Sequence, residues 1–490
     1  MEDHQQYSLS NSKRDQELLL APLVAMMPSP GMGHLIPMVE FAKRLSRHHN
    51  LQVTFLIPTN APPSKAQTTL LSSISHIFLP PVTLSEVPPN TQMDTLVSLT
   101  LLRSFPSLRH RLVSLAATSR VTALVLDFFG TDAFDLAREL NIPPYVFFPS
   151  AAMLLSCTLH LPRLDREVRC EFRDLADAVH IPGSVVPVRV TDMGEAFQDR
   201  NSDSYKWLLH HARKYWLAEG IIENSFPALE PDTLEFLLKD EPGRPPVYPV
   251  GPLVNEDDAQ TGMEMAEQCS CLKWLDTQPH GSVVFVCFGS GGTLSSAQIN
   301  ELALGLEMSE QRFLWVMKSP NEEAANASYF TADTHTDPLD FLPKGFVERT
   351  RGRGFVVPSW APQAQVLAHA STGGFLTHCG WNSVLESVVN GVPLVAWPLY
   401  AEQKMNAVFV TEVVKVALRP TVGENGLVER EEIASVVKIL MEGEEGKKLL
   451  HRMKELKEAA ATAITENGSS TMQISQLALK WKGQTTTMSN

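Results

Sequence analysis

Five side chains that could do chemistry lie within nine positions of the segment FLTHCGWNSVLESVVNGVP, residues 375–393. They are His378, Trp381, Asn382, Ser383 and Glu386. The apolar run before His378 predicts a buried strand, and the apolar spacing after Trp381 predicts a helix. In open α/β sheets, ligands bind where a parallel strand ends and a helix begins. The segment therefore predicts a ligand site at a strand-to-helix junction.

A helix that begins at Trp381 would offer a ligand the unpaired main-chain N–H groups of its first turn. These groups and the positive end of the helix dipole form an anion site, to which Asn382 and Ser383 add side-chain donors. The carboxylate of Glu386, one turn further along, would repel phosphate but can accept both hydroxyls of a ribose. Each residue alone could be a helix cap or a strand end, whereas the whole set predicts a nucleotide diphosphate site.

His34 and Asp127 form a second candidate pair, in the first half of the chain. His34 lies at a predicted strand-to-helix junction, and Asp127 ends the apolar run TALVLD. The helix N-terminus disfavours the imidazolium, so we expect a neutral ring with a pKa near the ordinary value of about 6.5, suited to accepting a proton. Asp127 held against His34 would fix the tautomer of the ring and stabilise the charge that it gains. We interpret Asp132 and Asp135 as charge complements at the start of the next helix.

Strands and helices alternate along both halves of the chain. The predicted strands are 23–28, 51–58, 76–80, 122–127, 143–148, 282–290, 312–318, 354–360, 373–378 and 393–398, and the predicted helices include 35–48, 131–140, 296–309, 401–414 and 472–483. A segment rich in proline and acid joins the two halves. This pattern predicts two doubly wound α/β domains that face each other across a cleft.

Composition and charge exclude several classes of protein. The formal net charge of −14 and the lack of a dense basic stripe argue against nucleic acid or an anionic membrane as a partner. The first apolar run follows an acid-containing stretch and is broken by Pro22, unlike a secretory signal. No apolar run reaches the length of a membrane span, and the six cysteines show no CxxC spacing. We therefore expect a cytoplasmic protein with reduced cysteines.

Residues 360–403 read WAPQAQVLAHASTGGFLTHCGWNSVLESVVNGVPLVAWPLYAEQ. From end to end, this stretch resembles the signature box of the plant secondary-product UDP-glycosyltransferases. The resemblance implies the GT-B fold, in which two Rossmann-like α/β domains face each other across a cleft. It also implies a UDP-sugar site in which Trp360 stacks on uracil, Ala361 and Gln363 hold the base and ribose, and Glu386 accepts the ribose hydroxyls.

The same resemblance assigns the remainder of the site. The diphosphate would be bound by His378, the main chain at Trp381, Asn382, Ser383 and, after an earlier strand, Ser290. The sugar hydroxyls would be bound by Glu402 and Gln403, and a box that ends in Gln is similar to the boxes of glucose users. The family also selects His34 and Asp127 as its catalytic pair.

The resemblance covers nearly the whole chain after about residue 20 and is similar to the branch that contains the hydroquinone glucosyltransferases. The expected organisation is a polar, disordered extension (1–20), an acceptor-binding domain (21–250), a linker (251–270), a UDP-sugar-binding domain (271–465) and a C-terminal helix that crosses back to the first domain (466–490). We expect neither the extension nor the acidic linker to carry chemistry.

The implied reaction is an inverting transfer, in which an acceptor oxygen attacks the anomeric carbon of UDP-glucose and a β-glucoside and UDP form. The chain lacks the Asp-x-Asp sequence that clamps manganese in the other glycosyltransferase architecture. We therefore expect no metal and no cofactor, with UDP-glucose as a co-substrate and the protein as a monomer. Phe128, Phe129, Phe147 and Phe148 could form walls for a flat aromatic acceptor, or ordinary core.

The acceptor itself stays open. Hydroquinone-like phenols, monolignols, flavonoids and indol-3-ols such as indoxyl all fit these walls, and another UDP-sugar is an alternative to UDP-glucose. Two alternatives come from different classes. An NAD-dependent oxidoreductase would use the glycines at 31 and 33, but Ile36 stands where its third glycine is required, and the second strand does not end in an acid. A non-catalytic small-molecule binder requires that His34 or Asp127 has no function.

Overall fold

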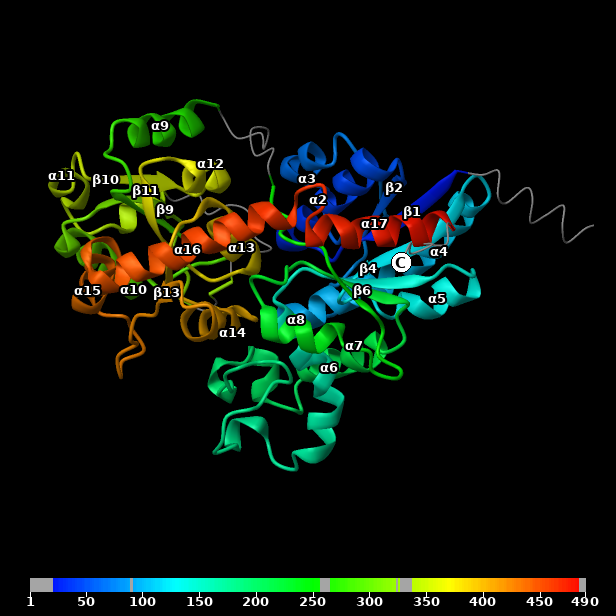
Figure 1. The fold of residues 1–490 in the computed structure, drawn as a ribbon. Coiled ribbons are helices and arrows are strands. Elements are labelled where there is room, and N and C mark those ends of the chain that lie inside the picture. The colour runs from blue at the N-terminus through cyan, green and yellow to red at the C-terminus, as the bar shows by residue number, and fades with distance from the viewer. Residues whose placement is uncertain (1–20, 89–90, 256–264, 323–324, 327–336, 484–490) are drawn as a thin grey trace, which may run out of the picture.

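The computed structural model of the chain describes residues 21–88, 91–255, 265–322, 325–326 and 337–483. Two parallel sheets, each with helices on both faces, lie beside each other (Figure 1). This confirms the predicted pair of doubly wound α/β domains. The predicted extension at 1–20, residues 256–264 of the predicted linker and residues 484–490 lie outside the described residues.

The N-terminal sheet has the strand order β3-β2-β1-β4-β5-β6-β7, and every neighbouring pair is parallel. Its strands are β1 (Pro22–Met27), β2 (Gln52–Ile57), β3 (Ser75–Phe78), β4 (Arg120–Asp127), β5 (Pro144–Phe148), β6 (Gly220–Glu223) and β7 (Val247–Pro249). Its helices are α2 (Met32–His49), α3 (Lys65–Leu70), α4 (Met93–Ala116), α5 (Ala133–Glu139), α6 (Ala152–Glu167), α7 (Asp203–Tyr215) and α8 (Pro231–Leu238), with 3-10 turns η1 (Phe172–Asp174), η2 (Val190–Asp192) and η3 (Glu195–Gln198). The strands are apolar on both faces because one face packs against α2 and the other against α4, α5 and α6.

The C-terminal sheet has the strand order β10-β9-β8-β11-β12-β13, again entirely parallel. Its strands are β8 (Val283–Cys287), β9 (Arg312–Met317), β10 (Gly354–Pro358), β11 (Thr372–Thr377), β12 (Leu394–Ala396) and β13 (Ala417–Leu418). Its helices are α9 (Met265–Asp276), α10 (Ser296–Ser309), α11 (Phe346–Arg349), α12 (Gln363–Ala368), α13 (Trp381–Asn390), α14 (Gln403–Val408), α15 (Arg430–Glu442) and α16 (Glu444–Ala463), with the turns η6 (Pro338–Phe341) and η7 (Phe409–Val413). Helix α13 and helix α10 lie in different apolar clusters, one on each face of the sheet.

Helix α17 (Ser469–Lys482) follows α16 and packs on the N-terminal domain, against α2, β1, β4 and β7 (Figure 1). Its Trp481 ring lies 5.2 Å from Tyr145 and 6.3 Å from Phe41, measured between ring centroids. The chain therefore passes between the two domains twice, once after β7 and once before α17. Helix α9 begins at Met265, inside the predicted linker, so the linker ends earlier than expected.

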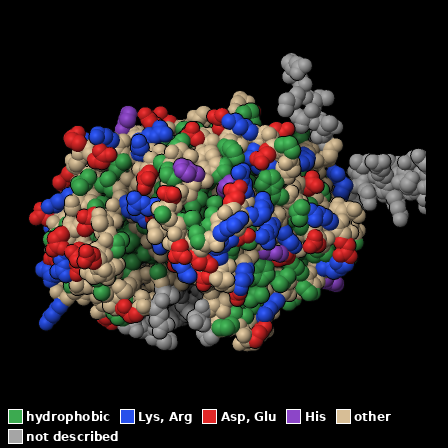
Figure 2. Space-filling model, turned by 90° about the horizontal axis from the view of Figure 1, so that it is seen from below, with side chains coloured by type: hydrophobic (Ala, Val, Ile, Leu, Met, Phe, Trp, Pro, Cys, Tyr) green, Lys and Arg blue, Asp and Glu red, His purple; other side chains and the backbone are tan. Residues whose placement is uncertain are grey.

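Two further features bear on the predictions. The predicted helix over 401–414 is shorter, because Ala401 has a left-handed backbone (φ 53°), and it begins at Gln403 and ends in the π-turn η7. Acidic and basic side chains are interspersed on the face that Figure 2 shows. In the described part of the chain, no helix is long and apolar enough to cross a bilayer.

Candidate active site

The candidate pair from the N-terminal domain is in contact. Helix α2 begins at Met32, earlier than predicted, so His34 lies in its first turn, and Asp127 is the fully buried last residue of β4. Because β1 and β4 are neighbours, the two junctions meet, and His34 Nδ1 lies 3.1 Å from Asp127 Oδ2. The other carboxylate oxygen of Asp127 accepts a hydrogen bond from Ser29 Oγ at 2.6 Å. Both oxygens are thus engaged, and the carboxylate is held in one orientation.

The electrostatics of His34 differ from the prediction. Burial lowers the pKa of the ring, but the negative charge and hydrogen bond of Asp127, with smaller contributions from Glu402 and Asp94, raise it above the ordinary value. The prediction that a helix N-terminus keeps the ring near its ordinary pKa is therefore wrong. Neighbouring carboxylates together outweigh the effect of burial because opposite charges stabilise the imidazolium.

Aromatic rings lie beside the imidazole. The Phe128 ring centroid is 5.4 Å from that of His34, the Phe129 centroid is 6.1 Å away, and the two phenyl rings are 4.0 Å apart. Phe148 is buried behind Phe128, with a centroid distance of 5.4 Å. Phe147 points to the opposite face of β5 and packs in the core against Phe41, because side chains alternate along a strand. The interpretation of Phe147 as an acceptor wall is therefore wrong.

Asp94, in the first turn of α4, is a site residue that the sequence analysis missed. Its carboxylate accepts a hydrogen bond from Ser204 Oγ at 2.7 Å, and burial raises its pKa. It lies close enough to His34 and Glu402 to perturb the pKa of both. An acid in the first turn of a helix is common, so its sequence position alone gives no signal of a site.

The start of α13 touches the N-terminal domain directly. Asn382 Nδ2 donates to the Gly33 carbonyl at 3.0 Å, and the buried Trp381 Nε1 donates to the Asn224 carbonyl at 2.8 Å. The predicted diphosphate residues therefore lie against the residue that precedes His34. Ser383, also predicted to bind diphosphate, is buried on the next position of α13.

His378 lies at the end of β11 in a tight surrounding. Burial and the nearby charge of Lys318 lower the pKa of its ring to about 3, so the imidazole is neutral. Gly289 and Gly380 press against it, since a Cβ at either position would lie 2.5 Å from the His378 Nε2 atom. Gly289 also has φ +72°, a conformation that favours glycine. Ser290, the predicted second phosphate contact, follows directly and is exposed.

The predicted base and ribose residues come from the segment after β10, the start of α12 and the middle of α13. Gln363 Nε2 donates to Glu386 Oε2 at 2.6 Å and to Ser383 Oγ at 2.9 Å, which places the Glu386 carboxylate and the Gln363 amide in one group. Trp360 is half-buried and the neighbouring Ala361 is buried. The arrangement presents an aromatic face and a carboxylate, as a nucleoside site needs.

Of the last two residues of the box, Glu402 lies near the candidate pair, and Gln403 supports the chain that leads to it. Burial raises the pKa of Glu402, the charge of His34 lowers it, and Asp94 raises it further. Gln403 is buried, and its side-chain oxygen accepts from the main-chain N–H groups of Leu399 at 2.9 Å and Tyr400 at 3.0 Å. Glu402 therefore brings the C-terminal domain within electrostatic reach of His34.

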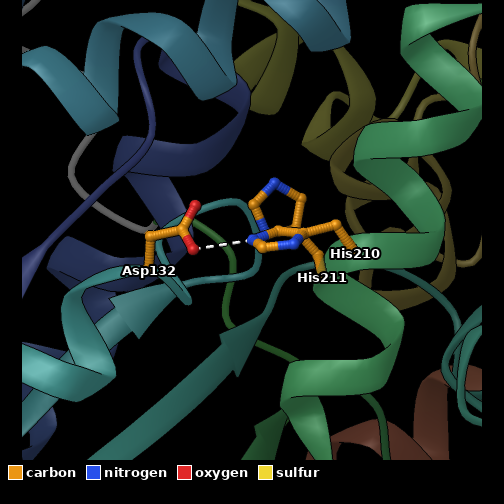
Figure 3. A group of neighbouring side chains, drawn as sticks. All are labelled: Asp132, His210 and His211. Carbon is orange, nitrogen blue, oxygen red and sulfur yellow. Dashed lines mark hydrogen bonds and ion pairs between the residues drawn. The ribbon is translucent and has the colours of Figure 1, made fainter.

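Helix α7 holds the loop that follows Asp127. Tyr215 Oη donates to the Phe128 carbonyl at 2.9 Å, and His211 Nδ1 lies 2.7 Å from Thr131 Oγ1. Asp132 points at the two histidines of α7 (Figure 3), and its Oδ1 accepts from His210 Nε2 and from Lys214 Nζ, both at 2.6 Å. Asp132 thus pairs with α7, while it also lies at the N-cap position of α5 with Asp135 in the first turn, as the predicted charge complements would.

Asp132, His210 and His211 also bring three potential metal ligands together within the described residues. The ammonium of Lys214 already neutralises Asp132, and His211 is engaged by Thr131 and by Ser98, whose Oγ lies 3.2 Å from Nε2. We therefore describe the group as an ion-pair and hydrogen-bond network that supports the loop after β4.

Comparisons with known proteins identify the family of the chain. A family model described as UDP-glucoronosyl and UDP-glucosyl transferase matches residues 246–459. Hydroquinone glucosyltransferase of Rauvolfia serpentina is 56% identical over 94% of this chain and 98% of its own length. UDP-glycosyltransferase 72B1 of Arabidopsis thaliana is 59% identical over 94% of this chain and 96% of its own.

Solved structures give the same result at the level of the fold. A UDP-glucosyltransferase from Polygonum tinctorium that glucosylates indoxyl, in complex with 3,4-dichloroaniline, is 53% identical with a TM-score of 0.87 and covers 94% of this chain and 99% of its own. Phytolacca americana UGT2, bound to UDP-2-fluoro-glucose and pterostilbene, is 51% identical with a TM-score of 0.86 and covers 94% and 100%. With most of its length matched at more than half identity, the chain belongs to the plant family 1 UDP-glycosyltransferases, enzymes of the GT-B fold.

Proposed function

We propose that this enzyme is an inverting, UDP-glucose-dependent O-glucosyltransferase whose acceptors are small phenols and related aromatic alcohols. The observation that carries the proposal is the contact between the two halves of the site. The His34–Asp127 pair lies at 3.1 Å, and Asn382 of the donor box is bonded to Gly33 at 3.0 Å, so a base stands next to the start of α13.

His34 would act as the general base. Its Nδ1–H donates to Asp127, which leaves the Nε2 lone pair to take the proton of the acceptor hydroxyl. As that proton moves to Nε2, the acceptor oxygen forms a bond to the anomeric carbon, the bond from that carbon to the phosphate oxygen breaks, and UDP leaves. Attack from the side opposite UDP turns the α-linked donor into a β-glucoside. Asp127 stabilises the imidazolium that forms.

The donor box would bind UDP-glucose in the manner of the family. Trp360, Ala361 and Gln363 hold the uridine, Glu386 accepts the ribose hydroxyls, and Glu402 with Gln403 binds the sugar. His378 is neutral, so it can give the diphosphate a hydrogen bond but no charge. The start of α13, Ser290, Asn382 and Ser383 provide further donors for the leaving group. We propose that no metal takes part, and excess EDTA should leave the rate unchanged.

Relatives and residues together support glucose and an aromatic acceptor. The Rauvolfia relative is named for hydroquinone and the Polygonum enzyme for indoxyl, and Phe128 and Phe129 place aromatic faces within 6.1 Å of the His34 ring. Hydroquinone-like phenols, monolignols and indoxyl are therefore the first acceptors to test. Flavonoids and another UDP-sugar remain the alternatives. Because the chain belongs to a transferase family, we reject the two alternatives of an NAD-dependent oxidoreductase and a non-catalytic binder. We also propose that the protein is a cytoplasmic monomer.

A direct assay tests the proposal. Purified enzyme is given UDP-glucose or UDP-galactose with hydroquinone, coniferyl alcohol, indoxyl or a flavonoid, and UDP release is measured. The anomeric configuration of each product is then read by proton NMR. We expect a β-glucoside and a higher kcat/KM with UDP-glucose. An α-glucoside, or equal kcat/KM for the two donors, would overturn the mechanism or the donor assignment respectively.

A further inference from the structure

Lys318 is a cation that the assigned site does not use. It is the first residue after β9, and β9 lies between β10 and β8 in the sheet. Trp360 follows β10 and Gly289 follows β8, so all three residues stand at the carboxyl edge of the same parallel sheet. A nucleotide that extends from Trp360 to the His378 end of the site crosses the end of β9, where Lys318 is.

The ammonium of Lys318 fastens the turn after β8. Its Nζ donates to the Gly289 carbonyl at 2.7 Å and also to the Ser290 carbonyl. This turn presses Gly289 against His378 and carries Ser290, and both His378 and Ser290 are among the predicted phosphate contacts. An ammonium has three donors, and these two carbonyls account for two of them.

No carboxylate pairs with Lys318 in the described part of the chain. The ionisable groups near it are Cys287 of β8 and His378 at the end of β11. Burial raises the pKa of the Cys287 thiol, and the His378 ring is neutral, so neither supplies a negative charge at neutral pH. A half-buried cation beside two neutral groups is suited to an anionic ligand.

We propose that Lys318 is a diphosphate-binding residue, which neutralises part of the charge of the UDP group and fixes the turn that bears Ser290. The proposal rests on the proposed function, because it requires a UDP-sugar in the donor box. It adds a full positive charge to a set of contacts that otherwise consists of neutral donors and a helix dipole.

The first test compares UDP with uridine by isothermal titration calorimetry. Lys318→Met keeps an apolar stem but removes the charge, and charge-assisted hydrogen bonds are strong enough that UDP should bind roughly ten- to hundredfold more weakly. Uridine, which lacks phosphate, should bind as in the wild type. Lys318→Arg keeps the charge and should retain most of the UDP affinity. Melting temperatures of both variants establish that they are folded.

The outcomes separate the two proposals. If the wild type does not bind UDP, the proposed function is wrong, whatever Lys318 does. If Lys318→Met weakens uridine and UDP equally, or weakens neither, the diphosphate role of Lys318 is wrong. If Lys318→Arg behaves like Lys318→Met, the charge is not what the site requires, and that also overturns the proposal.

A pH series gives a second, independent readout. Burial lowers the pKa of Lys318 to about 8. The ratio of UDP affinity to uridine affinity should therefore fall as pH rises above about 8 and the ammonium loses its proton. Uridine corrects for ionisation of the uracil ring. Lys318→Arg should remove the fall, because guanidinium stays charged. A ratio that is constant from neutral pH to pH 10 in the wild type would contradict the proposal.

Discussion

Two histidines lie on opposite sides of the site, and their surroundings drive their pKa values in opposite directions. Burial lowers the pKa of both rings, but the carboxylates of Asp127, Glu402 and Asp94 raise that of His34, whereas the charge of Lys318 lowers that of His378 further, to about 3. The surroundings of His34 therefore favour a protonated ring, as the proposed base needs after proton transfer, whereas those of His378 favour a neutral ring, as the proposed hydrogen-bond donor to the diphosphate needs. Burial alone does not decide the role of a histidine; the sign of its charged neighbours does.

The largest effects are expected when the ring of either histidine is removed. His34→Ala should lower kcat by roughly 10²–10⁴-fold, the usual contribution of a general base, and leave UDP affinity unchanged. His378→Ala, the matched control, should weaken UDP binding instead. Steady-state kinetics and calorimetry on both variants test the division. A near-normal kcat for His34→Ala at neutral pH would refute the catalytic role.

The raised pKa of His34 predicts the shape of the pH profile. The base must be unprotonated to act, so kcat/KM for the acceptor should fall at low pH with an apparent pKa above the ordinary 6.5. Asp127→Asn removes the main group that raises the pKa of His34, so the fall of kcat/KM at low pH should move to a lower pH. The same variant should lower kcat markedly, because the ring loses its fixed tautomer. If kcat/KM falls at the same pH in the wild type and in Asp127→Asn, a group other than His34 controls this pH dependence.

On the donor side, Glu386→Ala should affect the nucleoside rather than the phosphates. Loss of the carboxylate leaves the ribose hydroxyls without an acceptor, which should weaken UDP and uridine alike by roughly tenfold or more. The pattern differs from that expected of Lys318→Met, which spares uridine. In addition, 2′-deoxy-UDP should bind the wild type more weakly than UDP does, and Glu386→Ala should reduce that difference. Unchanged discrimination would remove Glu386 from the ribose site.

The donor side was far easier to predict than the acceptor side. Trp360 to Gln403 is one continuous stretch across three strand-to-helix junctions, so both its motif and its place in the fold are visible in the sequence. Asp127 was singled out because it ends a buried strand, and His34 because it lies at the junction between a buried strand and the next helix. Asp94 and the contacts of α7 come from distant segments, and their meeting depends on how helices pack over the sheet. Ser29 is close to His34 in the sequence, but its contact with Asp127 depends on β1 and β4 being neighbours.

Two errors have specific physical causes. The apolar run 143–148 predicts a buried strand but does not tell which residue faces which helix layer, and Phe147 faces α2. The pKa of His34 was judged from the helix dipole, whereas Asp127, the predicted partner of the ring, raises the pKa most, and Glu402 and Asp94 of other elements add to it. Lys318 has a weak signal, a lysine directly after the apolar run RFLWVM, which becomes meaningful only once the strand order is known.

A smaller effect is expected from His211, which supports the acceptor side through the loop after β4. Ser98 Oγ already donates to the Asp94 carbonyl at 2.7 Å, so His211 Nε2 must donate to Ser98, and Nδ1 must accept from Thr131. Burial lowers the pKa of the ring to about 3, which keeps it neutral. His211→Leu should lower acceptor kcat/KM by roughly tenfold through misplacement of the loop, with the KM for UDP-glucose unchanged.

The control for His211 is its neighbour His210, whose side chain is 40% exposed and shares Asp132 with Lys214. His210→Ala should therefore have little effect. His211→Gln, which can still donate where Nε2 does, should recover part of the activity. If all three variants have the same acceptor kcat/KM as the wild type, α7 does not position the loop.

The smallest effect on catalysis, and a measurable one on stability, is expected at Glu223, at the end of β6. It is fully buried, and neither carboxylate oxygen has a hydrogen-bond partner in the described part of the chain. Burial, with the nearby Glu230, raises its pKa well above the ordinary value. The folded protein therefore keeps the proton that the unfolded chain releases above about pH 4.5, so this residue makes folding less favourable as pH rises.

Glu223→Gln removes that dependence. The variant and the wild type should have similar free energies of unfolding near the ordinary pKa of glutamate, and the variant should then gain up to about 1.4 kcal/mol per pH unit until the folded pKa is reached. Glu230 is the control, because its carboxylate accepts hydrogen bonds from Ser225 Oγ and from the N–H groups of Ala152 and Met153. Glu230→Gln removes one of the two acceptor oxygens that these donors need. Glu230→Gln should be less stable than Glu223→Gln at every pH. Chemical denaturation at pH 5, 6 and 7 measures the free energy of unfolding of both variants and the wild type. If the difference between Glu223→Gln and the wild type stays constant with pH, Glu223 does not hold its proton in the folded protein.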